Sequence, residues 1–251
     1  MENKNSSNTL YRKYRPENFE EILGQKEIVD ILKKTITDKN TTHAYLFSGD
    51  RGTGKTSTAR IFAREIGCAP EDIYELDAAS NRGIGEIREI RDSVDILPMS
   101  SEYKVYIIDE VHMLTKDAFN ALLKTLEEPP KHIIFILATT EKEKILPTII
   151  SRCQVFEFKN PNLELLTELV LNVAKKEGRE IDQDSAKFIA EKGKGSFRDT
   201  LSVLQKVISI FDKKIEFNKL KEIFGGSNTD FENDFLKALS EKIKKKLLNF
   251  I

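Results

Sequence analysis

Short apolar runs alternate with longer amphipathic segments up to about residue 160. Apolar runs of four to eight residues are typical of buried strands, and longer segments with helical spacing are typical of helices. The predicted strands cover residues 44–48, 73–76, 104–108, 133–138 and 155–158. Strands that alternate with helices favour an α/β fold, in which helices cover both faces of a parallel five-stranded sheet.

The helix predicted over residues 116–128 has clear signals at both ends. Thr115 can cap its amino end, and Pro129 and Pro130 cannot continue it. Its apolar face is formed by Ala118, Phe119, Leu122, Leu123 and Leu126.

Beyond residue 160 the pattern predicts helices only, over 163–177, 183–192 and 197–211. Gly225, Gly226 and Ser227 are typical of a linker. We therefore expect an α/β domain over 1–159, a small three-helix domain over 160–226, and over 227–251 the start of a further helical domain.

Composition excludes several classes of protein. The chain has 251 residues and is 39% hydrophobic, which is enough for a sizeable core and too apolar for a wholly disordered chain. Its longest apolar run, 133–138, is far shorter than the roughly 20 residues of a membrane helix. The start of the chain carries no apolar signal core, and two distant cysteines form no disulfide framework. A cytoplasmic protein with no membrane contact is expected.

The net charge is −1, from 40 basic and 41 acidic side chains. Binding of a nucleic acid must therefore depend on local basic patches, because the whole molecule exerts no long-range attraction on phosphates.

Residues 49–56 match the phosphate-loop pattern G-x-x-x-x-G-K-[ST] in full, between a predicted strand and a predicted helix. In such a loop, backbone N–H groups converge on phosphate oxygens at a helix amino end. Lys55 would reach the β- and γ-phosphates, and the Thr56 hydroxyl would bind Mg²⁺. The candidate nucleotide-binding residues here are Gly49, Gly52, Thr53, Gly54, Lys55, Thr56 and Ser57.

A pair of carboxylates follows the strand predicted over 104–108. Asp109 can hold the Mg²⁺ shell, and Glu110 can act as a general base toward the attacking water. Alone, such a pair is often a solvated loop. Together with the phosphate loop it predicts binding and hydrolysis of a nucleoside triphosphate.

Several motifs together resemble the bacterial DNA polymerase III gamma/tau family, which are AAA+ clamp-loader ATPases. The resemblance covers residues 10–226. Its motifs are YRKYRP at 11–16, ILGQ at 22–25, HAYLFSG at 43–49, DAAS at 77–80, DEVHMLTKDAFNALLKTLEEPP at 109–130, LATT at 137–140, SRC at 151–153 and GSFRD at 195–199.

This resemblance implies ATP and Mg²⁺ as cofactors and gives roles to further residues. Thr139 or Thr140 resembles the polar sensor of the attacking water or γ-phosphate, although a threonine can also simply end its strand. Arg152 resembles the arginine that acts in trans, in the ATP site of a neighbouring subunit; without the resemblance it would read as an ordinary surface ion pair. Arg198 resembles the second sensor, which contacts ATP from the helical lid.

Other assignments leave alternatives open. Tyr11, Tyr14 and Pro16 are candidates to enclose the adenine, although core packing explains the two tyrosines nearly as well. His112 shows no partner in the sequence and is interpreted as structural.

Ser80 and Arg82 precede a predicted helix and are candidates for contact with a DNA phosphate, or for an ordinary helix cap. The turn over 96–99 (ILPM) could contact a sliding clamp or lie buried in the core.

The chain departs from the family in two places. Family members carry a four-cysteine zinc module after the phosphate-loop helix, but Cys68 is the one cysteine in that region, so we predict no zinc. Clamp-loader subunits also assemble through a helical collar domain, and residues 227–251 have room for only one or two helices, so we expect either a truncated chain or a weaker assembly.

The sequence favours an ATPase motor subunit that loads a sliding clamp onto primer-template DNA, as part of the DNA polymerase holoenzyme. Its expected partners are the delta, delta-prime and further gamma/tau subunits, the clamp and the DNA. Two alternatives are another AAA+ DNA-remodelling motor, of the type that drives branch migration of Holliday junctions, and a clamp-loader scaffold that does not hydrolyse ATP.

Overall fold

A computed structural model describes residues 9–81, 83–211 and 213–225 of the chain. Its centre is a parallel sheet of five strands, as the sequence predicts, and the strands lie in the order β2-β3-β4-β1-β5. The strands are β1 (Ala44–Ser48), β2 (Ile73–Asp77), β3 (Lys104–Asp109), β4 (Ile133–Thr139) and β5 (Gln154–Glu157). Each predicted strand is present, with ends that differ by at most one residue.

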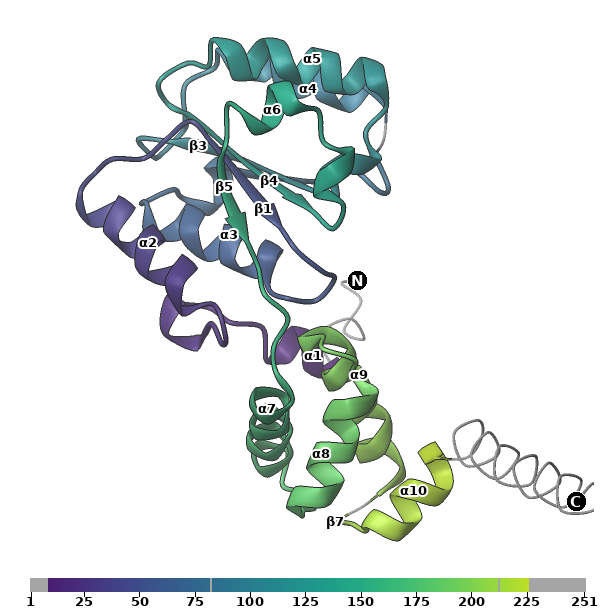
Figure 1. Cartoon of the computed structure of the whole chain (residues 1–251). Coiled ribbons are helices and arrows are strands. Elements are labelled where there is room, and N and C mark those ends of the chain that lie inside the picture. The colour runs from purple at the N-terminus through teal and green to yellow at the C-terminus, as the bar shows by residue number, and fades with distance from the viewer. Residues whose placement is uncertain (1–8, 82, 212, 226–251) are drawn as a thin grey trace, which may run out of the picture.

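Helices cover both faces of this sheet because its central strands are buried on both sides. Figure 1 shows α4, α5 and α6 on one face and α2 and α3 on the other. Successive residues of β3 point to opposite faces, so Tyr106 and Ile108 pack with the first group and Val105 and Ile107 with the second. These helices are α2 (Lys26–Thr37), α3 (Lys55–Glu65), α4 (Ile84–Ser93), α5 (Lys116–Glu127) and α6 (Pro147–Ile150).

Helix α5 starts where the sequence predicts and ends one residue earlier than predicted. The Thr115 side chain accepts a hydrogen bond from the N–H of Ala118, and the helix ends two residues before Pro129. Short 3-10 turns connect other elements, at Phe19–Glu21, Pro70–Asp72, Val111–Met113 and Lys142–Lys144.

The chain after β5 forms a second, mainly helical part with a core of its own (Figure 1). Its helices are α7 (Leu163–Lys176), α8 (Gln183–Lys192), α9 (Phe197–Ile210) and α10 (Phe217–Gly225). The expectation of three helices alone was incomplete, because α10 is a fourth helix in this range and β6 (Glu180–Ile181) and β7 (Lys214–Ile215) pair in parallel. Two-residue strands carry too few residues for a period-two pattern to be visible in the sequence.

The segment before the α/β part also packs on the helical part. Helix α1 (Leu10–Lys13) lies against α9, where the Leu10 N–H donates a 2.9 Å hydrogen bond to Gln205 Oε1. Leu10 is 4% exposed and belongs to the helical core. The chain therefore crosses between the two parts twice, after α1 and after β5 (Figure 1).

No helix within the described ranges is long and apolar enough to cross a bilayer. Gly225, the first residue of the predicted linker, is the last residue of α10, whereas the rest of the linker and the further helical domain over 227–251 lie outside the described residues.

Candidate functional site

The carboxyl ends of β1, β3 and β4 meet at one edge of the sheet. Strand β4 lies between the other two, with Thr139 opposite Ser48 of β1 and Leu137 opposite Ile108 of β3. Carboxyl ends of parallel strands in open α/β sheets form the usual ligand edge. This register brings the loop after β1 together with Asp109 and Thr139, which are far apart in the sequence.

The loop over residues 49–56 turns directly from β1 into α3. Gly54 precedes the first residue of α3 with φ +105°, a backbone conformation that side chains with a Cβ rarely adopt. Gly52 has no room for a side chain, because a Cβ there would collide with Ser196 Oγ at the start of α9. The Phe197 N–H also donates a 3.0 Å hydrogen bond to the Gly52 carbonyl. The loop is thus in direct contact with the helical part.

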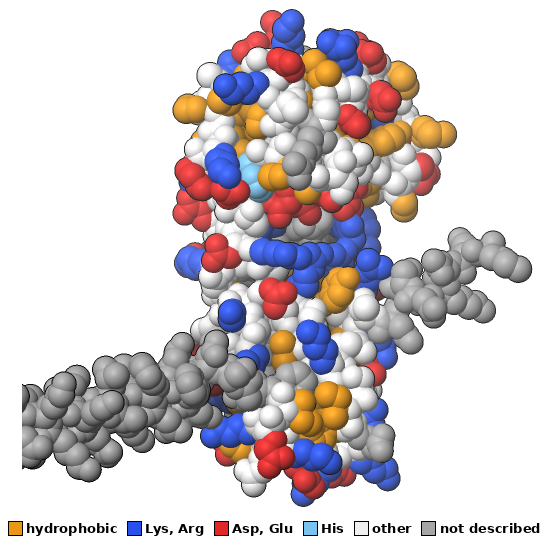
Figure 2. Space-filling view, turned by 90° about the vertical axis from the view of Figure 1, so that its right-hand side faces the viewer, with side chains coloured by type: hydrophobic (Ala, Val, Ile, Leu, Met, Phe, Trp, Pro, Cys, Tyr) orange, Lys and Arg blue, Asp and Glu red, His pale blue; other side chains and the backbone are white. Residues whose placement is uncertain are grey.

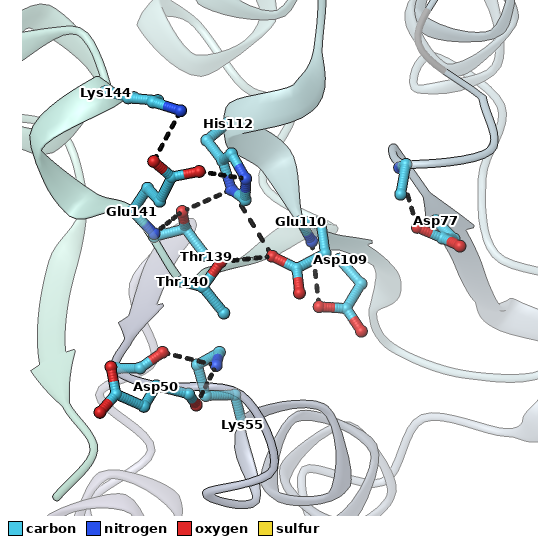
Figure 3. Close-up of polar contacts among 12 residues, drawn as sticks. Asp50, Lys55, Asp77, Asp109, Glu110, His112, Thr139, Thr140, Glu141 and Lys144 are labelled. Carbon is cyan, nitrogen blue, oxygen red and sulfur yellow. Dashed lines mark hydrogen bonds and ion pairs between the residues drawn. The ribbon is translucent and has the colours of Figure 1, made fainter.

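Lys55 is 5% exposed, and its ammonium lies within the loop. Nζ donates to the carbonyls of Gly49 and Asp50 at 2.7 and 2.8 Å (Figure 3). Burial lowers the pKa of Lys55, and the nearby carboxylates of Glu110, Asp109 and Asp50 oppose that shift. The ammonium is therefore held at the base of the site, beside the backbone groups of the loop.

Thr56 and Asp109 connect the loop to β3. Thr56 Oγ1 donates a 2.7 Å hydrogen bond to Asp109 Oδ2, and the other carboxylate oxygen accepts from the Glu110 N–H at 3.0 Å. Mg²⁺ prefers oxygen ligands and is usually bound by one or two carboxylates, waters and substrate phosphates. The hydroxyl and carboxylate oxygens of this pair fit that donor set.

Glu110, Thr140 and Thr139 form a polar network beside Asp109 (Figure 3). Thr140 Oγ1 donates to Glu110 Oε2 at 3.1 Å, whereas Thr139 Oγ1 lies 3.0 Å from His112 Nδ1. Of the two threonines that the sequence left open, Thr140 is the one that contacts Glu110. The sequence showed no partner for His112, but the structure places it against Thr139, Glu110 and Glu141.

A cleft of about 520 Å³ opens between the loop and the helical part. Its basic lining residues are Lys13, Arg15, Arg51, Lys55, Lys176 and Arg198, and its acidic ones are Glu17, Glu21, Asp109 and Glu110. Figure 2 shows a band of Lys and Arg side chains across the constriction between the two parts of the molecule. The excess of basic lining residues favours an anionic ligand.

Most of the predicted nucleotide-binding residues line this cleft. They include Tyr14, Pro16, Gly52, Thr53, Gly54, Thr56 and Ser57. Tyr11 is not among the lining residues, and its ring lies 5.3 Å from Arg198 Cζ, in cation–π contact. Gly49 is not among the lining residues, but its carbonyl accepts a hydrogen bond from Lys55 Nζ.

Sequence reasoning missed two residues of this region, although both lie in motifs that it quoted. Arg15, in the motif over 11–16, is half-buried and lines the cleft. Gln25, at the end of ILGQ, is 4% exposed and joins the loop to the segment after β5. Its Nε2 donates to Lys159 O at 2.7 Å, and its Oε1 accepts from Lys159 N at 3.2 Å.

Two predicted residues lie away from the cleft. Arg152 follows α6 and precedes β5, near the amino ends of the strands and so at the end of the sheet opposite to the cleft. Its guanidinium contacts Thr148 O at 2.7 Å and Glu127 Oε1 at 3.0 Å. Ser80 lies in the turn after β2 and donates to Asp77 Oδ2 at 3.0 Å. Its predicted companion Arg82 lies outside the described residues.

The turn over 96–99 is exposed, and the alternative of burial in the core is wrong. Ile96, Leu97 and Met99 are 61%, 71% and 79% exposed. The turn is nevertheless held in place, because Asp72 accepts hydrogen bonds from the N–H groups of Met99 and Ser100.

Within the described ranges, no group of three or more His, Cys, Asp or Glu side chains is arranged to hold a metal ion. The absence of zinc stays a prediction.

Comparison with known proteins supports the family resemblance. The family model for "DNA polymerase III, delta subunit" matches residues 24–83 and 70–162. The tau subunit of DNA polymerase III from Bacillus subtilis is 44% identical over 94% of this chain and 46% of its own length. The gamma subunit from Buchnera aphidicola is 39% identical over 95% of this chain and 72% of its own length. Against the tau and gamma/tau relatives of Bacillus and Mycobacterium, this chain spans about half of their length.

Among solved structures, the RuvB Holliday junction branch migration motor of Thermotoga maritima has a TM-score of 0.70 with 22% identity. The match covers 92% of this chain and 80% of the motor. At this identity the likeness concerns the fold, which is that of an AAA+ P-loop protein. The level of identity and the coverage of the sequence relatives show that the chain belongs to the bacterial DNA polymerase III gamma/tau family.

Proposed function

We propose that this chain is the ATP-hydrolysing motor of a clamp loader, acting in the DNA polymerase III holoenzyme to load a sliding clamp onto primer-template DNA. The observation that carries the ATPase part is the 2.7 Å hydrogen bond from Thr56 to Asp109, in the cleft that Lys55 and Glu110 also line. A nucleotide-binding loop alone would need no ordered carboxylate pair at its mouth.

In this proposal each side chain acts where the structure places it. The Lys55 ammonium and the loop N–H groups bind the β- and γ-phosphates, and Glu110 accepts a proton from the attacking water. Mg²⁺ bound by Thr56 and Asp109 would neutralise charge on the phosphate oxygens. Thr140 orients the Glu110 carboxylate, and Arg198 contacts the phosphates from α9.

Arg152 would complete the site of a neighbouring subunit. Its position at the opposite end of the sheet keeps its guanidinium away from the cleft of its own chain. A permanently charged, planar guanidinium is well suited to the charge that develops on phosphoryl oxygens. The proposed neighbours are the delta, delta-prime and further gamma/tau subunits, and DNA contact near Ser80 and Arg82 belongs to this proposal as well.

Clamp loading on primed DNA tests the proposal. The chain, assembled with its proposed partner subunits, is compared with a Lys55→Ala variant for ATP hydrolysis and for clamp loading. We expect both activities to be lost in the variant while the assembly still forms. ATP binding without hydrolysis by the unaltered chain would instead favour a scaffold subunit. Branch migration of a Holliday junction by the unaltered chain would favour the other motor class.

A further inference from the structure

His112 lies directly behind the proposed general base, in the 3-10 turn Val111–Met113 that follows β3 (Figure 3). Its side chain is only 5% exposed. Both ring nitrogens face polar atoms: Nδ1 is 3.0 Å from Thr139 Oγ1 and 3.5 Å from Glu110 Oε2, and Nε2 is 3.2 Å from Glu141 Oε1. A buried imidazole with contacts on both nitrogens has a fixed ring orientation.

The partners also decide which nitrogen carries a proton. An ionised carboxylate can only accept, so the contact with Glu141 requires the proton on Nε2. Lys144 contacts the other oxygen of Glu141 at 2.6 Å, and this hydrogen bond holds the pKa of Glu141 below its usual value. Glu141 therefore stays ionised, and Nδ1 is available to accept a hydrogen bond from the Thr139 hydroxyl, while the ring edge packs 3.5 Å from Glu110 Oε2.

Thr139 is held in the same network from the other side. It is fully buried, and its Oγ1 accepts a 3.0 Å hydrogen bond from the Glu141 N–H. Its hydroxyl hydrogen can then point at Nδ1 of His112. The ring thus joins the end of β4 to the turn after β3.

Glu110 combines an unusual backbone conformation with few side-chain contacts. Its φ is +48°, in the left-handed region that residues other than glycine rarely adopt. Among the described residues, its carboxylate is contacted by Thr140 at 3.1 Å and by His112 at 3.5 Å. These two contacts limit the directions in which the carboxylate can point.

We propose that His112 is a positioning residue for hydrolysis: oriented by Glu141, it keeps the Glu110 carboxylate and Thr139 in a fixed relative position at the carboxyl edge of the sheet. This inference rests on the proposed function, because it concerns the reaction in that cleft. A positioning role for His112 and a purely structural role predict different effects of losing the ring. Loss of the ring displaces the base without removing any group that binds the nucleotide.

The test compares His112→Ala with His112→Asn in the full chain, assembled with its proposed partner subunits. An asparagine side chain can place its carbonyl oxygen near the Nδ1 position, where it can accept from the Thr139 hydroxyl, but it cannot reach Glu141. We expect His112→Ala to lower kcat about tenfold to a hundredfold, because a misplaced catalytic group costs that much. The KM for ATP and the Kd for a non-hydrolysable ATP analogue should stay within about twofold. His112→Asn should recover part of kcat.

His132 provides a matched control. It is also partly buried, and its Nε2 lies 2.9 Å from Val94 O, but it stands at the amino end of β4, away from the cleft. His132→Ala should leave kcat unchanged even if it lowers Tm as much as His112→Ala does.

The inference is overturned if His112→Ala hydrolyses ATP at the parental kcat, or if its loss of kcat is matched by His132→Ala at equal loss of Tm. A loss of analogue binding in His112→Ala that equals its loss of kcat overturns it too. If the unaltered chain binds the analogue but does not hydrolyse ATP, the proposed hydrolysis fails first, and the inference falls with it.

Discussion

Thr56 Oγ1 lies 2.7 Å from Asp109 Oδ2 and donates a hydrogen bond to it, which joins the first turn of α3 to the last residue of β3. The two residues are far apart in the sequence and meet because β4 places β1 and β3 on either side of itself. Each contributes an oxygen of the type that Mg²⁺ binds. We therefore expect Mg²⁺-dependent hydrolysis to require the Thr56 hydroxyl.

Thr56→Val removes the hydroxyl with little change of shape, and Thr56→Ser keeps it. We expect the valine variant to lose roughly a hundredfold in kcat, which is typical for the loss of one polar group that stabilises transition-state charge. The serine variant should stay near the parental rate. Steady-state ATP hydrolysis, measured over a range of Mg²⁺ concentrations, distinguishes the two. Equal rates for valine and serine would remove Thr56 from the metal site.

Arg198 reaches the cleft from α9, so its loss should weaken nucleotide binding. Hydrogen bonds to charged groups contribute about 1.5 kcal/mol or more, so Arg198→Ala should raise the Kd for ATP roughly tenfold. Arg91→Ala is the control, because Arg91 is exposed on α4 and pairs with its neighbour Asp92. Isothermal titration of both variants with a non-hydrolysable analogue gives the comparison. An unchanged Kd for Arg198→Ala would place its role elsewhere.

Asp72 predicts a pH dependence of stability. It is fully buried, and although burial raises its pKa, hydrogen bonds from the N–H groups of Met99 and Ser100 and from Ser101 outweigh this and hold the pKa below its usual value. Its stabilising contribution is therefore complete above the unfolded pKa, about 3.9, and is lost as the pH falls through the lower folded pKa.

Asp72→Asn should accordingly be less stable than the parent at pH 7, and the difference should shrink as the pH falls below about 3.9. Urea unfolding between pH 7 and pH 3 measures both. Asp95→Asn serves as the control, since Asp95 is exposed and directly precedes the turn over 96–99. A difference between Asp72→Asn and the parent that is constant over the whole range would show that ionisation of Asp72 contributes nothing.

Gln25 predicts a stability effect in the connection between the two parts of the chain. Gln25→Leu keeps the volume but leaves the N–H and C=O of Lys159 without their partner. These hydrogen bonds are partly buried and each contributes about 1 kcal/mol, so thermal unfolding should occur at a lower temperature. The exposed Gln183 gives the matched control, Gln183→Leu, with little expected change. Equal Tm values for the two variants would contradict the role of Gln25.

The most accurate sequence predictions concern elements that depend on local chemistry. The strand over 44–48, the helix over 183–192 and the cap at Thr115 are all present as predicted. Elements with a short hydrophobic pattern, and contacts with a segment that is distant in the sequence, were not predictable. The two-residue strands β6 and β7 and the packing of α1 on α9 belong to this second group. Leu10 looks like any apolar residue until α9 provides its neighbours.

The candidate site divides in the same way. By itself, the sequence determined the phosphate loop and the carboxylates after β3, because glycine spacing, a lysine and a strand that ends in Asp109 and Glu110 are local features. Tertiary structure alone decided which groups these residues meet. The order of the strands sets Thr56 against Asp109, and the ends of β3 and β4 enclose His112 between two carboxylates. Contacts between residues distant in the chain depend on sheet register, which no single segment encodes.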